Sequence, residues 1–382
     1  MVQPDQPPST DGRQPLSTAI DHFVADKEKL DGSGNYADMA GRVVRKWADQ
    51  HCDRVEYVDE VEPRHMESYA DYLARRAQAR AADPQGEAGI TGRTAQQYYS
   101  LVRAFLTHCQ KWEWISDNPA IVERVTDKLP ERSLGETDTQ QFWSPAERRE
   151  LCAFADERAR EAIDEVGLEA RTAARDRALV YILAYTGARV GELVRDSRDR
   201  RRNGITWSDV DLADNRIQVL GKDQQREHVP LPEQAHPAIE QWERILDPPV
   251  DSWPVFPTLH APSLHAQIPD NVTVEEDVLD TVRASDARPP SISVNGVRNV
   301  LKRLCEDGNI TVEGDKEYLT PHGARRGVGE FLYRNVGFEA AQRALRHEDP
   351  GTTSQMYSHI EASELADVTG DAFENHDSNR DG

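Results

Sequence analysis

Hydrophobic residues recur every three or four positions over residues 15–125, which is the spacing of one face of a helix. Pro63 and Thr91 suit helix starts, and Asn118 followed by Pro119 breaks the pattern. We therefore predict a four-helix domain over 15–125, behind a disordered tail over 1–14. The four apolar faces contain Leu16, Ile20, Phe23 and Val24; Met39, Val43 and Trp47; Met66, Tyr69 and Leu73; and Tyr98, Leu101, Val102, Phe105, Cys109 and Trp112.

The pattern stops at residues 126–143, which are polar and contain a proline and a glycine. We predict a linker there. A new helix then opens at Ser144, because Ser144, Pro145 and Glu147 form an N-cap, a first-turn proline and a capping box. A further helix over 171–186 is almost wholly apolar in its second half, so it is predicted to be buried.

Short strands and more helices follow. We predict strands at 204–207, 216–220 and 228–231, and a partly irregular, proline-rich insertion over 247–290 with a short helix near 274–284. Helices are expected over 294–305, after Pro321, and at 360–373, before a polar tail over 371–382. The predicted fold class is mainly α with a small β-sheet: a helical N-terminal domain and a mixed α/β domain over 144–370.

The net charge of −22 has the wrong sign for a protein that binds nucleic acid. Only eight of the 46 basic residues are lysine, and acid-rich, lysine-poor chains are typical of proteins that work in concentrated salt. In such salt the gain from counterion release shrinks, and binding depends more on bidentate arginine contacts. Two interpretations stay open: a halophilic protein that binds DNA in this way, or an acidic protein that never touches DNA.

Several classes of protein are disfavoured. The first residues are polar and proline-rich, unlike a signal peptide, and the longest uncharged apolar run, 178–188, is too short to span a membrane. The four cysteines are far apart, which favours free thiols in a reducing cytoplasm over disulfides or a metal site. No carboxylate cluster or phosphate-binding glycine loop is visible, so we expect neither a metal nor a nucleotide cofactor.

The candidate chemistry is concentrated in residues 320–359. This stretch contains His322 and Arg325, three residues apart and thus on one helical face, followed by His347 and Tyr357. A phenol titrates near ~10, so Tyr357 can attack a phosphodiester only where cations hold the phosphate. Arginine suits that task, because its planar fork makes two parallel bonds to phosphate oxygens and keeps its charge.

Two further cations lie upstream. Arg189 follows the apolar helix, and Glu192, three residues later, is placed to orient its guanidinium. Lys222 lies in a predicted turn between two strands. Taken alone, each of these residues is more simply explained as a surface side chain.

The order and local wording of these residues resemble the tyrosine recombinase (phage integrase) family. The chain contains TGxRxxEL, a Gly-Lys turn before a VPL strand, PHxxRR, an L-x-H and TTxxxY, in that order. The resemblance implies a SAM-like core-binding domain over 15–125 and a catalytic domain over 144–370. It also implies a site-specific recombinase that forms a 3′-phosphotyrosine, without metal or ATP, as a homotetramer on a double-stranded DNA site. The implied catalytic set is Arg189, Lys222, His322, Arg325, His347 and Tyr357.

The resemblance also implies roles for individual residues, and the chain departs from the family pattern at two points. It makes Lys222 the acid that protonates the leaving 5′ oxygen, while His322 handles the phenol proton. Arg346 stands where the family usually has glycine, and the spacing from His347 to Tyr357 is one residue longer than expected. In the N-terminal domain, candidate DNA contacts lie at the start of the fourth helix: Arg93, Thr94, Gln96 and Gln97.

Two alternative functions remain. A type IB topoisomerase uses the same chemistry but nicks and reseals one strand, and the separate helical domain argues against it. A decayed recombinase would bind DNA without cutting, and Arg346 and the acidic charge are its support. Between integration of a mobile element and resolution of chromosome dimers, the predicted insertion and tails favour integration.

Overall fold

A computed structural model describes residues 13–31, 35–83, 89–131, 140–221, 224–274 and 277–346, together with residues 351, 354 and 356. The chain divides into two compact units, and each is described by itself. The N-terminal unit comprises residues up to 138 and residues 198–200, and the C-terminal unit comprises the remainder. Over the described residues, the helices lack the length and apolar character needed to traverse a bilayer.

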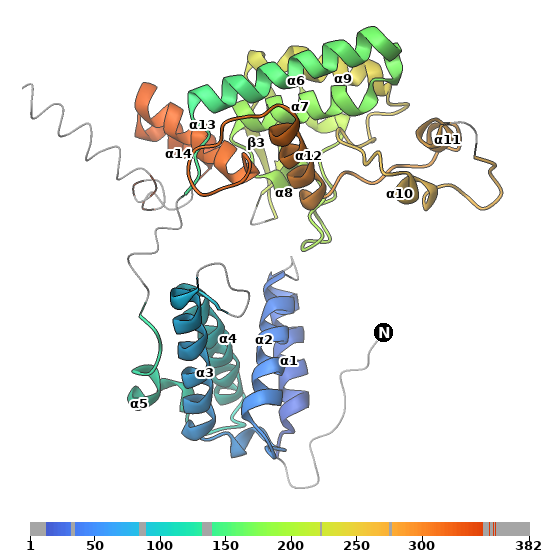
Figure 1. The fold of residues 1–382 in the computed structure, drawn as a ribbon. Coiled ribbons are helices and arrows are strands. Elements are labelled where there is room, and N and C mark those ends of the chain that lie inside the picture. The colour runs from blue at the N-terminus through green and yellow to red at the C-terminus, as the bar shows by residue number, and fades with distance from the viewer. Residues whose placement is uncertain are drawn as a thin grey trace, which may run out of the picture. The chain divides into compact units, whose positions relative to one another are not determined.

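The N-terminal unit is a bundle of four long helices (Figure 1). Its apolar faces meet in one core, in which the rings of Phe23, Trp47 and Phe105 pack edge to face. The four predicted helices are therefore confirmed. The helices are α1 (Leu16–Asp31), α2 (Asn35–His51), α3 (Pro63–Ala82), α4 (Gly92–Lys111) and α5 (Glu123–Thr126), with 3-10 turns at Val58–Glu60 and Pro119–Ile121.

The C-terminal unit combines helices with a small sheet, as predicted. Its helices are α6 (Pro145–Val166), α7 (Arg171–Thr186), α8 (Val190–Leu193), α9 (His236–Leu246), α10 (Ala261–His265), α11 (Val278–Ala284), α12 (Val294–Asp307), α13 (Pro321–Asn335) and α14 (Phe338–Leu345). Short 3-10 turns lie at Gly167–Glu169, Trp207–Asp209 and Glu233–Ala235. The Ser144–Glu147 capping box at the start of α6 is present, with Ser144 N donating to the carboxylate at 2.7 Å.

Helix α7 is the centre of this unit, because α6, α9 and α13 all pack against it (Figure 1). The second half of its sequence, from Ala178, carries no charged residue, as a helix packed against several others requires. One carboxylate lies inside this packing: Asp176 is only 1% exposed and accepts from Arg158, Arg175 and Arg303. These guanidiniums compensate for the cost of burying its charge.

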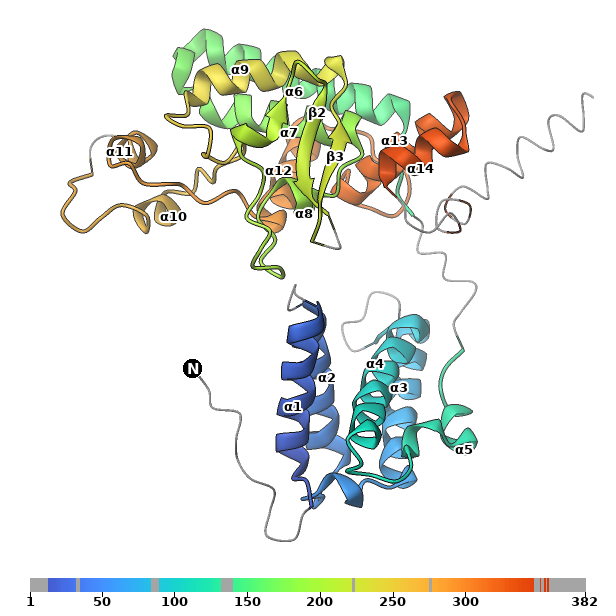
Figure 2. The ribbon, with the colours of Figure 1, turned by 180° about the vertical axis from the view of Figure 1, so that it is seen from behind.

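The sheet is antiparallel in the order β1 (Val210–Asp211), β2 (Arg216–Leu220), β3 (Arg226–Pro230), with β2 and β3 side by side in Figure 2. The prediction of a strand at 204–207 was wrong. Thr206 forms only an isolated bridge with Pro254, and the chain then curls into a 3-10 turn. Asp209 causes this curl, because its carboxylate accepts from both the backbone and the hydroxyl of Thr206. The third strand begins two residues earlier than predicted.

The stretch predicted as an insertion, 247–290, contributes to the core at its start. Trp253, Val255 and Phe256 are buried, and the Trp242 indole donates to the Val255 carbonyl at 2.6 Å. Helix α11 confirms the short helix expected there, and it is attached to α7 by ion pairs from Arg171 to Asp277 and Asp280.

Candidate active site

Arg189 is positioned by the corner that ends α7. Gly187 adopts a left-handed conformation (φ 65°), which glycine reaches without steric cost and which turns the chain out of the helix. Arg189 then precedes the first turn of α8, where Glu192 holds it twice. The Glu192 carboxylate accepts from the Arg189 backbone at 3.0 Å and from its Nη1 at 2.9 Å. The Arg189 side chain is one-third exposed, although its Nη1 is bonded to a fully buried carboxylate.

Arg325 lies in α13 and is 4% exposed. Its Nη1 donates to the Gly187 carbonyl at 2.5 Å, and its Nη2 donates to the Leu345 carbonyl. The guanidinium therefore joins the corner after α7 to the end of α14. Because Gly187 lies two residues before Arg189, this bond brings the second predicted clamp arginine to the segment that carries the first.

His322 lies one helical turn before Arg325, on the same face of α13. Burial against the unit opposes protonation of its ring, and the charges of Arg326, Arg325 and Arg189 add to this effect. Together they lower the pKa of His322 to about 4. The residue as a whole is exposed, and water moderates the cost of charging it. The imidazole is thus neutral at pH 7 and able to accept a proton.

Residues 141–143 fix the start of α13. Gln141 accepts from the Thr320 backbone at 2.7 Å, and the Trp143 indole donates to the Thr320 carbonyl at 3.0 Å. The backbone of Trp143 also donates to the Gly323 carbonyl at 3.1 Å and crosses α13 at Gly327, where a side chain would collide with it. These three residues fall in the stretch predicted as a linker, yet here they pack into the C-terminal unit.

The structure thus brings together Arg189, Glu192, His322 and Arg325 from α8 and α13. Lys222, His347 and Tyr357 lie outside the described residues. Their neighbours are described: Leu220 ends β2 and Arg226 begins β3 on either side of the turn that contains Lys222.

Sequence analysis did not identify Arg346 and Glu227 as part of this site. Arg346 ends α14 in a left-handed conformation (φ 52°) and reaches the Glu192 carboxylate and Glu227 on β3. Burial opposes ionisation of Glu192, but Arg346 and Arg189 outweigh it and hold the pKa of this carboxyl below its usual range. The departure from glycine at position 346 was visible in the sequence, but its partners were not.

Comparison with known proteins settles the family. The model of the phage integrase family matches residues 154–364, a span that includes all six predicted catalytic residues. The chain belongs to the phage integrase family. The curated proteins similar to it include the tyrosine recombinase XerD of Halalkalibacterium halodurans, 28% identical over 51% of this chain and 52% of the relative. Another is the tyrosine recombinase XerC of Xanthomonas axonopodis, 26% identical over 73% of this chain and 72% of the relative.

Solved structures of recombinases share the fold of this family member. One is XerH site-specific recombinase bound to a palindromic difH substrate in a post-cleavage complex, with a TM-score of 0.57 and 13% identity over 94% of this chain and 96% of that chain. Another is a lambda integrase dimer bound to a COC′ core site, with a TM-score of 0.55 and 12% identity over 90% and 95%. The predicted fold class is confirmed, and the relatives support the predicted class of enzyme, a site-specific DNA recombinase.

The chain spans about half the length of the first of these relatives. In the N-terminal unit, some of the candidate DNA-contact residues of this integrase-family chain are bonded to other residues of the unit. The Thr94 hydroxyl is bonded to Thr91 at 2.8 Å as part of the α4 cap, and the Gln96 amide donates to the Pro130 carbonyl at 2.8 Å. Arg93 and Gln97 are exposed.

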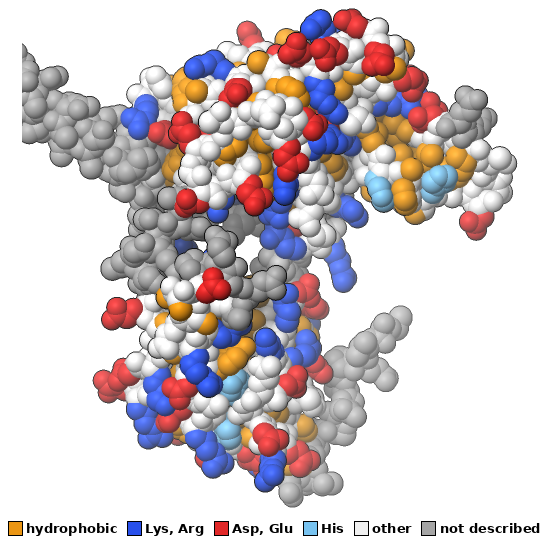
Figure 3. Space-filling model, in the orientation of Figure 1, with side chains coloured by type: hydrophobic (Ala, Val, Ile, Leu, Met, Phe, Trp, Pro, Cys, Tyr) orange, Lys and Arg blue, Asp and Glu red, His pale blue; other side chains and the backbone are white. Residues whose placement is uncertain are grey.

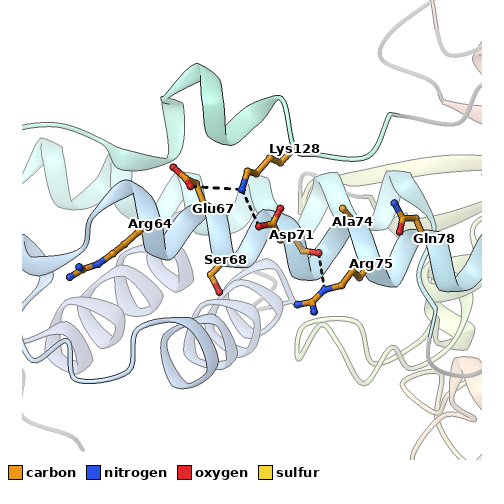
Figure 4. Close-up of a pocket in the computed structure, with 8 residues that line it drawn as sticks. All are labelled: Arg64, Glu67, Ser68, Asp71, Ala74, Arg75, Gln78 and Lys128. Carbon is orange, nitrogen blue, oxygen red and sulfur yellow. Dashed lines mark hydrogen bonds and ion pairs between the residues drawn. The ribbon is translucent and has the colours of Figure 1, made fainter.

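A shallow groove along α3 is the other notable surface of this unit (Figure 4). Lys128 lies across it and pairs with Asp71 at 3.0 Å and Glu67 at 3.8 Å. Arg64 is paired with Glu62 at 3.1 Å. Carboxylates therefore already accompany Lys128 and Arg64, whereas Arg75, which also lines the groove, donates to the Asp71 carbonyl at 3.3 Å.

Proposed function

We propose that this chain cuts and rejoins DNA at a specific site through a 3′-phosphotyrosine intermediate. The observation that carries the proposal is the convergence of Arg189 and Arg325 at Gly187, beside the neutral ring of His322. Two guanidiniums match the two non-bridging oxygens of a phosphodiester, and preorganised donors of this kind are worth roughly 10²–10³ in rate each.

The reaction balances with residues of this chain alone. The Tyr357 oxygen attacks phosphorus and gives its proton to His322, and a phosphorus–oxygen bond forms as the bond to the 5′ oxygen breaks. Lys222 donates a proton to that oxygen, because a compact ammonium gives up its proton more readily than a guanidinium. Arg189, Arg325 and His347 hold the charge that develops on the phosphate. Attack by a 5′ hydroxyl on the phosphotyrosine reverses the steps, so the exchange needs neither ATP nor metal.

The two units divide the work of holding DNA. We assign residues 144–370 to catalysis and the helical domain over 15–125 to gripping the duplex; 126–143 connect them, with 141–143 packed into the C-terminal unit. Within the helical domain, Arg93 is the better candidate for a DNA contact, because it is exposed, whereas Thr94, Gln96 and Gln97 are bonded within the unit. Thr94 still orders the first turn of α4, where backbone amides face outward.

Charge on the C-terminal unit is uneven. Figure 3 shows many acidic side chains over α6 and several basic side chains lower on this unit, with acidic ones among them. Exposed acids on α6 include Glu157, Glu161, Asp164 and Glu165. The group of basic side chains supports DNA binding by this unit, despite the net charge of −22.

Exchange between two DNA sites requires four active sites, so we propose a homotetramer on DNA. An apolar pocket formed by α7, α13 and α14 supports this assembly. Its lining includes Tyr185, Val328 and Leu332, and Phe331 at its edge is 41% exposed. An apolar pocket of this kind suits a segment from a neighbouring protomer.

We also propose that the protein works in concentrated salt in the cytoplasm of a halophile. The acidic, lysine-poor composition supports the first point, and four free, buried cysteines support the second. DNA affinity measured from low to molar salt tests this. Binding that persists at molar salt is expected, and binding that vanishes well below it overturns the halophilic assignment.

A nicked suicide duplex tests the central proposal. The wild-type protein is expected to form a covalent protein–DNA adduct that Tyr357→Phe abolishes and Tyr333→Phe, a change to a tyrosine of α13, preserves. A protein that binds the duplex without any adduct, even in molar salt, would instead be a decayed binding module. Relaxation of supercoiled DNA without strand exchange between two sites would favour a type IB topoisomerase. We favour integration over dimer resolution as the biological reaction.

A further inference from the structure

Arg346 occupies a position that is costly for its residue type. It lies at the end of α14 with φ 52°, a left-handed conformation that costs a residue with a side chain roughly 1–2 kcal/mol relative to glycine. Its side chain is only 12% exposed, so the guanidinium is also largely removed from water. A residue that bears both costs must make contacts that offset them.

These contacts are two carboxylates from different elements. The Nη2 atom donates to Oε2 of Glu192, whose side chain is completely buried, and the Nη1 atom donates to Oε2 of Glu227 on β3. The same Glu192 holds Arg189 through its other oxygen at 2.9 Å. The result is a continuous chain of ion pairs, Arg189–Glu192–Arg346–Glu227, from the proposed phosphate clamp to the sheet.

The charges in this chain matter for Arg189. A buried carboxylate paired with one guanidinium cancels most of its field, and such a pair attracts a phosphate poorly. When a second guanidinium shares the carboxylate, part of the positive charge on Arg189 remains available to a phosphate. Arg346 thus shares Glu192 with Arg189, but Glu227 in turn balances Arg346, so the four side chains carry no net charge and the main effect on Arg189 is orientation.

The second contact concerns the sheet. Glu227 is the second residue of β3, five positions after Lys222 in the sequence, and its side chain lies against Gly221. Arg346 immediately precedes His347 in the chain, and the carbonyl of Leu345 before it accepts from Arg325. One side chain thus connects the segments that bear Arg189, Lys222 and His347.

We propose that Arg346 is a positioning residue for cleavage, which orients Arg189 through Glu192 and ties the β2–β3 turn to the clamp through Glu227. This inference rests on the proposed recombinase function. A purely structural salt bridge is the competing explanation, and the two differ in what glycine does at this position.

Arg346→Gly separates them, because glycine keeps the left-handed turn, and with it the Leu345 carbonyl, while it removes the guanidinium. We expect an unchanged or higher melting temperature and an unchanged affinity for the duplex. We also expect the first-order rate of adduct formation at saturating protein to fall by about tenfold or more, as a misplaced clamp predicts. Arg346→Lys keeps the charge but cannot bond both carboxylates in the same way, and it should recover part of the rate.

Glu227→Gln provides an independent measurement that does not depend on the turn. It should slow adduct formation roughly three- to tenfold in the wild type and less than about twofold in the Arg346→Gly background, because the two residues act through one contact. Arg343→Ala, an exposed arginine of the same helix, is the matched control and should leave the rate unchanged.

The outcomes are distinct. If the wild type forms an adduct and Arg346→Gly forms it at the same rate, the positioning role is overturned and the recombinase function stands. Equal slowing by Glu227→Gln in both backgrounds also overturns the coupling. If the wild type forms no adduct, the proposed function fails and the inference fails with it.

Discussion

Gly327 controls how closely α13 approaches residues 141–143, and Gly327→Ala tests whether that approach sets the active site. A methyl group added at Gly327 would lie 2.4 Å from the Trp143 carbonyl oxygen and 2.9 Å from its nitrogen. Carbon–oxygen contacts normally begin at about 3.3 Å, so the helix and the segment must separate by roughly 0.9 Å. Both atoms belong to the backbone, so no side-chain rotation relieves the collision.

The cost has two opposing parts. Overpacking and a stretched bond from Trp143 to Gly323 cost about 2–4 kcal/mol together, while alanine in a helix interior regains about 1 kcal/mol over glycine. We expect a net loss of about 1–3 kcal/mol in the free energy of unfolding. His322 and Arg325 lie on the same helix, and a displacement near 1 Å costs about 10²-fold in rate.

Urea unfolding and adduct formation on a suicide duplex measure both effects. Gly41→Ala in α2 is the matched control, because the added methyl there meets only the tips of the Arg45 and Val24 side chains, which can move. Wild-type stability together with a wild-type cleavage rate for Gly327→Ala would refute the reasoning. Lost stability with a normal rate would show that the packing matters but does not align the site.

Three further changes have definite expected outcomes. Asp176→Asn should lower the free energy of unfolding, measured in urea, by about 3 kcal/mol, because buried Arg175 loses its charged partner. A loss below about 1 kcal/mol would contradict a structural role for this cluster. His322 has a folded-state pKa of about 4, below its unfolded value of about 6.5, so it resists protonation and its contribution makes stability fall as pH drops between these values. Thermal unfolding across this range should show a shallower decline for His322→Gln, and an unchanged slope would point to another group. Arg325→Lys should slow adduct formation by roughly 10²–10³-fold, because one ammonium cannot reach the carbonyls of both Gly187 and Leu345. Its DNA affinity should change by less than about tenfold. A cleavage rate near the wild-type value would remove Arg325 from the clamp.

The features of this fold that depend on short-range interactions could be predicted from the sequence. Apolar periodicity predicted the four N-terminal helices, and the capping residues of Ser144 and Thr91 predicted two helix starts correctly. The same logic put His322 and Arg325 on one face of α13. In each case the determining interaction spans only a few residues, so it can be read directly from the chain.

Contacts between distant segments were not predictable in this way. Gln141 bonds to Thr320 across 179 positions, and nothing in the polar stretch around Gln141 distinguishes it from a linker. The strand predicted at 204–207 failed because one carboxylate, Asp209, captures the backbone of Thr206. Arg346 was recognisable as a departure, but its partners on α8 and β3 are defined only by the folded chain.

Arg325 is anchored by main-chain oxygens, and this affects how the site tolerates mutation. The carbonyls of Gly187 and Leu345 are present whatever side chains stand at those positions, so ordinary substitutions nearby cannot delete the anchors. Both are neutral dipoles, so they hold the guanidinium without cancelling its charge, and dissolved ions screen them less than they screen an ion pair. The vulnerable feature is the path of the backbone, above all the left-handed bend at Gly187, where a bulkier residue would redirect the carbonyl itself.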